Sequence, residues 1–168
     1  DYIACQVSAN NPKKDVRRDS WLQLFATFPG MTFVLLGDHN GTLEFPNVVD
    51  LRGRTDLGEA TAVIGAAVLF VGPDSGLTHL AACGGQQTVC ISQSANLGYF
   101  FPYPQSWQRD NLLVVHNQRY AHCSGCLMVC RHEPLWQTYQ RGSRCLRELP
   151  SRAVVDAISD ALRRTAQG

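Results

Sequence analysis

The sequence lacks any apolar run that approaches the roughly 20 residues needed to cross a bilayer. Its first residues also lack the basic and then apolar pattern of a secretion signal. Neither sign of charge is in excess, because 15 basic and 14 acidic residues leave a formal net charge of +1. The total charge therefore gives no indication of a nucleic-acid partner or of attraction to a membrane surface. We expect a cytoplasmic protein with no transmembrane segment and no nucleic-acid partner.

Two further absences narrow the class. No Gly-x-Gly-x-x-Gly motif follows the first predicted strand, which weakens the case for a nicotinamide-dependent dehydrogenase. The chain has seven cysteines, and an odd number argues against a fully paired disulfide framework and favours a reducing compartment. Cys5, Cys83 and Cys90 fall in predicted strands or at a helix end, so we expect them to be small buried apolar residues.

Apolar residues make up 45% of the 168 residues and charged residues 17%, enough for one well-filled core in a single domain spanning 1–168. Hydrophobic patterning predicts strands at 2–7, 32–36, 48–51, 68–71, 88–92 and 111–116. It predicts helices at 20–27, 57–67, 77–83 and from 151 onward, with Asp56 and Glu59 as a reciprocal capping pair for the second. Strands that alternate with helices imply right-handed crossovers, so the expected fold is α/β, a Rossmann-like three-layer sandwich with a mostly parallel sheet.

The most informative segment is Asp74-Ser75-Gly76-Leu77-Thr78-His79, which follows an apolar strand and opens an alanine-rich helix. Asp74 or Ser75 can cap the helix with a side-chain oxygen, and Gly76 leaves the backbone open to a ligand. The unbonded N–H groups of the first turn and the positive end of the helix dipole then favour a phosphate. His79 follows one turn later and can donate a hydrogen bond or a proton. A turn that only caps its helix carries the same residues, so both interpretations stay open.

Basic residues gather in the loop after the first predicted strand. This loop contains Ser8 and both lysines of the chain, Lys13 and Lys14, and it is followed by Arg17 and Arg18. Ligands of parallel sheets bind outside the carboxyl ends of the strands, so the loop and the Asp74 segment should open on the same rim. Cations beside a helix N-terminus indicate a diphosphate. Taken alone, the lysines are more simply explained as a solvated basic turn.

Four cysteines form a second cluster, in which Cys123-x-x-Cys126 is followed by Cys130 and Cys145. Four thiols, two of them in a Cys-x-x-Cys pair, are what tetrahedral zinc or iron coordination needs. The gaps are irregular for a zinc ribbon, and His122 and His132 are candidate substitutes if one cysteine is not a ligand. Unliganded thiols or a partial disulfide are the alternative. Either way we expect a structural role, because the cysteine-rich insertion at about 122–146 has little core of its own.

The runs at 51–57 and 66–82, with the Asp-Ser-Gly-x-x-His core, resemble the C-terminal half of glycosyltransferase family 9. That family includes the ADP-heptose:lipopolysaccharide heptosyltransferases, and the flanking elements follow in the expected order over essentially the whole chain. The resemblance implies the C-terminal half of a GT-B enzyme, which holds the nucleotide sugar. The resemblance favours an ADP-linked, heptose-like donor, and the reaction would be hexosyl or heptosyl transfer to a lipopolysaccharide or protein acceptor. The protein itself would be cytoplasmic and at most peripheral to the inner membrane.

By this resemblance, Asp74, Ser75, Gly76 and Leu77 match the loop that meets the diphosphate and the sugar. Thr55 matches a residue near the base, and His79 matches the motif histidine. The family's Lys-x-Trp-Pro-like step is absent here, since Asp19-Ser20 precedes Trp21. Lys13, Lys14, Arg17 or Arg18 must then contact the phosphate, and Ser8 is a further candidate in the same loop.

The resemblance also implies that catalysis needs a second domain. In this family an N-terminal acceptor domain carries the catalytic carboxylate, so we expect no catalytic residue in this chain and little or no transfer by the chain alone. No cofactor is expected for catalysis, because lysine, arginine, His79 and helix N–H groups can stabilise a departing diphosphate. A subgroup of the family that acts on bacterial autotransporters, with cysteine-bound iron, resembles the cysteine segment further.

Two other functions fit the same residues. One is a non-catalytic nucleotide-binding or metal-stapled interaction module, with the aromatic loop 99–107 as its contact surface. The other is a different GT-B enzyme, such as a sugar epimerase.

Overall fold

The computed structural model describes residues 1–38, 41–107, 110–126 and 129–166, so residues 127–128 of the cysteine-rich insertion lie outside the described residues. Its strands are β1 (Tyr2–Gln6), β2 (Thr32–Leu36), β3 (Val48–Asp50), β4 (Leu69–Pro73), β5 (Thr88–Ile91) and β6 (Leu112–Val115). Its α-helices are α1 (Arg18–Thr27), α2 (Leu57–Ala66), α3 (Gly76–Cys83), α4 (Leu135–Arg141), α5 (Arg144–Arg147) and α6 (Ser151–Thr165). Short 3-10 helices cover Pro12–Lys14, Ser94–Asn96, Gln105–Trp107 and Gln118–Cys123.

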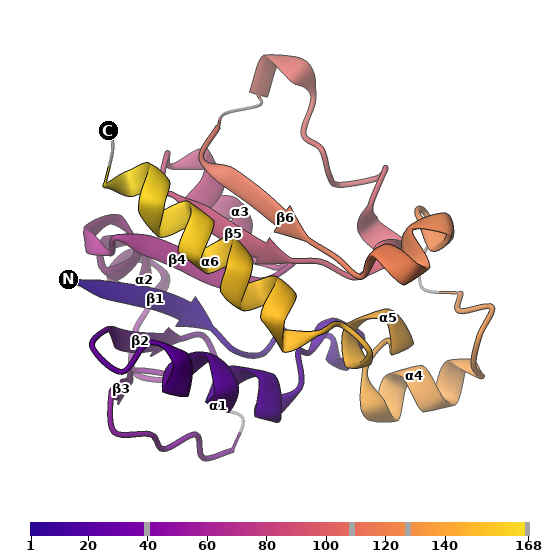
Figure 1. The fold of residues 1–168 in the computed structure, drawn as a ribbon, viewed down its shortest axis with the longest axis horizontal. Helices are drawn as coiled ribbons and strands as arrows, with labels where there is room; N and C mark the ends of the chain where they lie inside the picture. Colours follow the sequence, from indigo (N-terminus) through magenta and orange to yellow (C-terminus); the bar gives the residue numbers. More distant parts are fainter. Residues whose placement is uncertain (39–40, 108–109, 127–128, 167–168) are drawn as a thin grey trace.

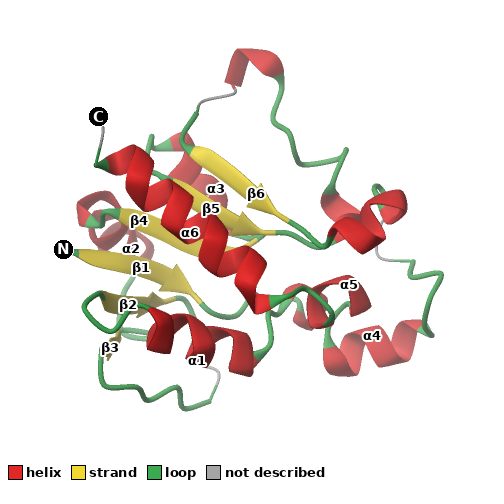
Figure 2. Cartoon of the chain, viewed as in Figure 1, coloured by secondary structure: helices red, strands yellow, loops and turns green. Residues whose placement is uncertain are grey.

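The strands form one six-stranded sheet in the order β3-β2-β1-β4-β5-β6, and every neighbouring pair is parallel (Figure 2). This confirms the predicted α/β fold, and the predicted strand limits differ from the observed ones by at most two residues. The chain moves from β1 outward to β3, then returns to place β4 on the other side of β1. In a doubly wound sheet, the carboxyl ends on either side of that reversal are where ligands bind.

Helices cover both faces of the sheet, α1 and α6 on one side and α2 and α3 on the other (Figure 1). The last helix lies on the core with one face, as its pattern predicted: Val154, Ile158 and Ala161 are buried. On the same side of the sheet, the rings of Phe25 and Phe33 pack with centroids 4.8 Å apart. Helices therefore cover both faces of the sheet, which leaves the carboxyl ends of the strands as the place where a ligand can approach.

Helix α2 begins with the predicted capping pair. The Glu59 N–H donates to Asp56 Oδ1 at 2.8 Å, and the Asp56 N–H donates to Glu59 Oε2 at 2.9 Å. Two of the N–H groups that a helix start leaves without partners are thus satisfied by the helix itself.

The turn from β4 to α3 is packed too closely for a side chain at Gly72. A Cβ there would lie 2.9 Å from Thr78 Oγ1 and 3.0 Å from a Phe70 ring carbon. The prediction that Asp74 or Ser75 caps α3 through its side chain is wrong, because no side-chain cap bond is made. The Ser75 hydroxyl instead donates to Gln6 Oε1, at the end of β1. The first turn of α3 therefore keeps its N–H groups available.

The cysteine-rich part of the chain contains two helices, α4 and α5, that patterning did not predict. They lie beyond the carboxyl ends of the strands (Figure 1). Arg147 and the buried Glu133 form an ion pair at 2.5 Å, and the Thr138 hydroxyl donates to Glu133 Oε1 at 3.1 Å. Leu135 and Trp136 are exposed, and the Thr138 hydroxyl bonds α4 to the segment that precedes it.

The cysteines in the first half of the fold differ in burial. Cys5 and Cys90 are buried as expected, but Cys83, the last residue of α3, is exposed. The prediction of a buried Cys83 is therefore wrong. Burial raises the pKa of the Cys90 thiol, which fits its role as an apolar core residue.

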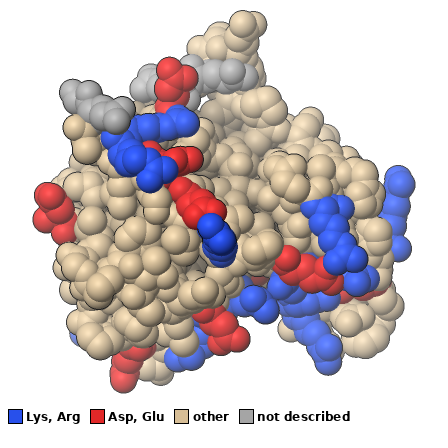
Figure 3. Space-filling model, in the orientation of Figure 1, with Lys and Arg blue, Asp and Glu red and all other residues tan. Residues whose placement is uncertain are grey.

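On the face seen in Figure 3, basic and acidic side chains are intermixed and form no broad area of one sign. This agrees with the near-zero net charge. Among the helices of the described residues, none combines the length and apolar character that a bilayer crossing requires.

Candidate functional site

A cavity of about 860 Å³ lies at the carboxyl ends of β1, β2 and β4. The loop after β1 contributes Asn10, Asn11 and Lys14 to its lining, and the turn after β4 contributes the residues from Asp74 to Leu77. The remaining lining residues come from the ends of β1 and β2, the start of α2, the helix α3 and the loop after β5. They include Gln6, Asp38, Thr55, Leu57, Ala60, Leu80 and Phe100. The cavity thus occupies the place where the strand order reverses, as the topology predicts.

The N-terminus of α3 opens into this cavity. The first bond of the helix runs from the His79 N–H to the Ser75 carbonyl at 3.1 Å, so the preceding N–H groups have no acceptor within the helix. A Cβ on Gly76 would meet no protein atom within 4 Å. An anion can therefore approach the backbone here and meet N–H donors together with the positive end of the helix dipole.

Lys14 is the only basic side chain that lines the described part of this cavity. Its ammonium donates to the Asp74 carbonyl at 2.9 Å and to Asp74 Oδ2 at 3.1 Å. It also lies 6.0 Å from the centroid of the Phe100 ring, within cation–π range. These contacts hold the ammonium in one orientation. Because the side chain is 19% exposed, the charge can still be reached from the cavity.

The Asp74 carboxylate is almost fully buried, with 1% of its side chain exposed. Both of its oxygens are occupied: Oδ1 lies 3.0 Å from His79 Nε2, and Oδ2 accepts from Lys14 and from the Asn96 amide. Burial alone raises the pKa of Asp74, but the hydrogen bond with His79 and the nearby Lys14 outweigh it and lower the pKa below its ordinary value. Asp74 is thus ionised at neutral pH, and its carboxylate serves the protein's own residues.

Six of the residues predicted to bind a nucleotide sugar line the cavity together: Lys14, Thr55, Asp74, Ser75, Gly76 and Leu77. Ser8, Lys13 and His79 do not line it. Lys13 is 4% exposed, and its carbonyl accepts from the N–H and the hydroxyl of Ser143. Arg17 and Arg18 also lie outside the lining, so of the basic cluster only Lys14 faces the site.

Patterning missed several residues of this site, among them Gln6, Asp38, Asn96 and Tyr103. Gln6 and Asp38 could have been found, because the first ends β1 and the second follows β2, both at the rim where ligands bind. Asn96 and Tyr103 contact Asp74 and His79 from a segment without periodicity, and no sequence signal placed them there.

Comparison with models of known protein families shows which family has this sequence pattern. The family model "Glycosyltransferase family 9 (heptosyltransferase)" matches residues 36–128, more than half of the chain. The chain belongs to glycosyltransferase family 9. No curated protein sequence gives a significant match.

Solved heptosyltransferase structures share the fold. E. coli ADP-heptose lipopolysaccharide heptosyltransferase II superposes with a TM-score of 0.71 at 17% identity, over 98% of this chain and 47% of that one. The dodecameric iron-containing heptosyltransferase TibC, in complex with ADP-D-β-D-heptose, gives 0.73 at 19% identity, over 99% and 47%. E. coli WaaC with ADP-2-deoxy-2-fluoro heptose gives 0.62 at 18% identity, over 95% and 42%. This chain therefore spans about half the length of these enzymes.

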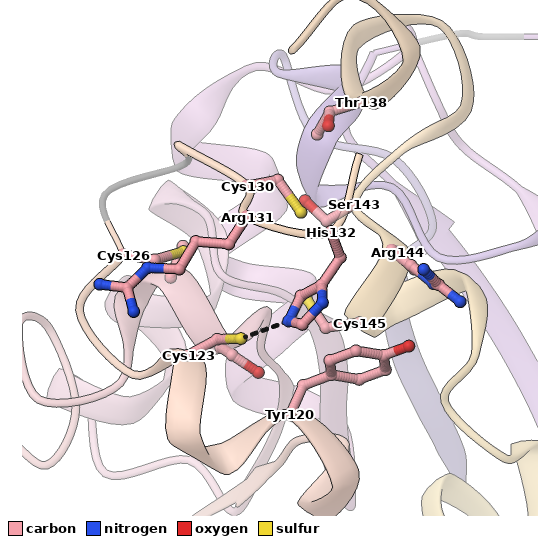
Figure 4. Close-up of a pocket in the computed structure, with 12 residues that line it drawn as sticks. Tyr120, Cys123, Cys126, Cys130, Arg131, His132, Thr138, Ser143, Arg144 and Cys145 are labelled. Carbon is pink, nitrogen blue, oxygen red and sulfur yellow. Dashed lines mark hydrogen bonds between the residues drawn. The ribbon is translucent and has the colours of Figure 1, made fainter. Parts of the chain in front are cut away.

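A second, smaller pocket in this family 9 chain is lined by Cys123, Cys126, Cys130 and Cys145, with His132 among them (Figure 4). It contains about 30 Å³ of space. His122, Cys123 and His132 each offer a ligand atom, and these atoms lie within 4.8 Å of one another. Cys123 Sγ is 3.2 Å from His132 Nε2.

The donor set in this pocket fits a transition metal. Two imidazoles and a thiol are ligands of zinc and iron, and further thiols line the same pocket. The closely spaced group differs from the predicted set of four cysteines, since Cys126, Cys130 and Cys145 lie outside it in the described residues. Burial and the neighbouring thiols raise the pKa of Cys123, so a bound cation would be needed to favour its thiolate at neutral pH.

Proposed function

We propose that this chain is the donor-binding half of a glycosyltransferase and that its cavity holds a nucleoside-diphosphate sugar of the ADP-heptose type. The observation that best supports this proposal is that the Lys14 ammonium and the open N-terminus of α3 face one cavity of about 860 Å³. A fixed cation beside a set of backbone donors is suited to the two phosphates of a nucleoside diphosphate. Two solved relatives whose fold the chain shares are named as complexes with ADP-heptose or its fluorinated analogue.

The rest of the cavity suits the other parts of such a donor. Leu57, Ala60, Leu77 and Leu80 form an apolar wall between α2 and α3, where a flat base can pack, with Thr55 nearby as a polar contact. Asp38 offers a carboxylate that can accept from ribose hydroxyls at the end of β2. Leu57 is 64% exposed, so its side chain is accessible to a base that enters the cavity.

In the transfer reaction, the bond between the sugar and the diphosphate breaks, and negative charge develops on the departing nucleotide. Lys14 and the N–H groups of α3 would stabilise that charge, and Asp74 would hold Lys14 in place. The acceptor hydroxyl needs a base to remove its proton. Because the chain spans about half of its solved relatives, we assign the base and the acceptor site to the other half of the enzyme. A lipopolysaccharide acceptor fits the name of E. coli heptosyltransferase II.

Calorimetric titration of the chain with ADP, UDP and GDP tests the donor proposal. We expect saturable binding of ADP, with UDP and GDP weaker, because two solved relatives are named as complexes with an ADP-linked sugar. A Ser75→Ala variant, which retains the backbone donors, should lose less affinity than Gly76→Val, whose side chain fills the open space above the helix start. Absence of binding by all three nucleotides would contradict the proposal and favour the interaction module instead.

For the second pocket we propose a structural zinc or iron ion held by His122, Cys123 and His132, with a fourth ligand from the neighbouring thiols. TibC, whose fold this chain shares, is named as an iron-containing enzyme. Such an ion would link the 3-10 helix at 118–123 to the segment before α4, which is otherwise held by the Glu133–Arg147 pair.

Metal analysis by inductively coupled plasma mass spectrometry tests this second proposal. We expect about one zinc or iron per chain, and a lower thermal midpoint after treatment with a chelator. Cys123→Ser should lose the metal, whereas Cys83→Ser, an exposed cysteine far along the sequence from the cluster, should retain it. A metal-free chain whose midpoint is unchanged by Cys123→Ser would contradict a metal site.

A further inference from the structure

The segment 97–107, which we call the aromatic segment, is tied to the donor cavity through one carboxylate. Asn96, which immediately precedes it, is 2% exposed and donates its side-chain N–H to Asp74 Oδ2. The carbonyl of Asn96 also accepts from the N–H groups of Tyr99 and Phe100, at 3.2 and 2.9 Å. The first turn of the aromatic segment is therefore built on a residue that binds Asp74.

The aromatic segment reaches Asp74 a second time, through His79. The Tyr103 hydroxyl lies 2.6 Å from His79 Nδ1, and His79 Nε2 lies 3.0 Å from Asp74 Oδ1. The ring of Phe101, which is 2% exposed, stacks on the imidazole at 5.4 Å with an interplanar angle of 13°. The His79 ring is thus oriented by contacts on both of its nitrogens and on one face.

These contacts select one form of the imidazole. A neutral histidine has one N–H and one acceptor nitrogen, and an ionised carboxylate can only accept. The ionised Asp74 Oδ1 can only accept from Nε2, and the Tyr103 hydroxyl can donate to Nδ1. The neutral ring that satisfies both partners at once carries its proton on Nε2. Burial raises the pKa of Tyr103 to about 12, so this hydroxyl retains its proton at neutral pH.

We propose that Tyr103 is a positioning residue of the donor site: it fixes His79 as the Nε2–H tautomer, and His79 in turn holds the Asp74 carboxylate against Lys14. Without the hydroxyl, His79 can also adopt the Nδ1–H tautomer, in which a lone pair on Nε2 faces Asp74 Oδ1. The carboxylate then loses one of its donors, and Lys14 loses a fixed partner. The expected effect on ADP binding rests on the donor-binding function proposed above. The role of Tyr103 in setting the tautomer of His79 does not depend on that function.

Nitrogen-15 NMR of the imidazole in the ligand-free chain tests the first step. In the wild type we expect the chemical shifts of a single Nε2–H tautomer for His79. In Tyr103→Phe we expect a mixture of both tautomers, and in the matched control Tyr99→Phe, whose ring is 66% exposed in the same segment, the wild-type shifts. A wild-type mixture, or an Nε2–H tautomer that persists unchanged in Tyr103→Phe, would overturn the proposal.

ADP affinity tests the second step. Tyr103→Phe is expected to weaken ADP binding by a factor of about 3 to 10, in line with the loss of one hydrogen bond. In a His79→Ala background the same substitution should have no further effect, because Tyr103 acts through His79. An equal loss in both backgrounds would refute that route. If the wild type binds no nucleotide, the donor proposal fails, and the NMR result alone still decides whether Tyr103 sets the tautomer of His79.

Discussion

Replacement of Lys14 by methionine is expected to weaken ADP binding by a factor of about 10 to 100, the loss of one or two hydrogen bonds from a charged donor. Methionine retains most of the length of the side chain and removes only the ammonium. Lys14 is the only basic residue lining the described part of the cavity, so no neighbouring side chain can replace its charge. Isothermal titration at two salt concentrations measures the effect, and the wild type should show the steeper salt dependence.

The adjacent lysine provides a matched comparison. Lys13 has the same charge and the same loop, but it is 4% exposed and does not line the cavity. Lys13→Met should therefore change ADP affinity by less than about threefold, measured on protein that circular dichroism shows to be folded. A larger loss from Lys13→Met than from Lys14→Met would show that the diphosphate lies elsewhere.

Replacement of Asp74 by alanine is expected to lower the free energy of unfolding by about 2 to 4 kcal/mol. The substitution leaves the buried Asn96 amide and the half-buried Lys14 ammonium and His79 ring without their shared acceptor. Urea denaturation measures the change. Asp38→Ala is the matched control, since this exposed carboxylate lines the same cavity, and its loss should change the free energy by less than about 0.5 kcal/mol.

The dependence on pH gives an independent check of the same carboxylate. The pKa of Asp74 is lowered in the folded chain from its ordinary value of 3.8. A depressed pKa stabilises the fold above the unfolded-state pKa, and the stabilisation is lost as the pH falls through the folded-state pKa. The difference between wild type and Asp74→Ala should therefore be full at pH 6 and shrink below about pH 4. A difference that does not change with pH would contradict an ionised, paired Asp74.

The strands and the covering helices could be predicted because their apolar residues are placed by local periodicity. The Asp56–Glu59 pair and the face of α6 formed by Val154 and Ile158 are examples. By contrast, α4 exposes Leu135 and Trp136, and its Thr138 hydroxyl bonds Glu133, which pairs with Arg147 of α5. Exposed apolar residues do not show the pattern of a helix laid on a core, so patterning did not find α4.

The cavity was predictable to the extent that it depends on topology. Parallel strands bring the Lys14 loop and the Asp74 turn to one rim, and that much follows from the order of elements. The directions of the side chains at that rim could not be predicted from the order of elements. Nothing in the sequence distinguishes Lys13 from Lys14, and nothing showed that Asp74 turns inward to bind Lys14, His79 and Asn96 instead of capping α3. These are long-range choices, made by packing between distant segments.

The most direct test of the central claim is to map the backbone amide shifts of the nitrogen-15-labelled chain during titration with ADP. We expect the largest changes at the N–H groups of Gly76 and Leu77 at the start of α3, where the diphosphate is proposed to lie. Smaller changes should follow along the apolar wall, at Leu57 and Ala60. Saturable binding that leaves the amides of Gly76 and Leu77 unmoved, or that shifts the cysteine pocket instead, would contradict it.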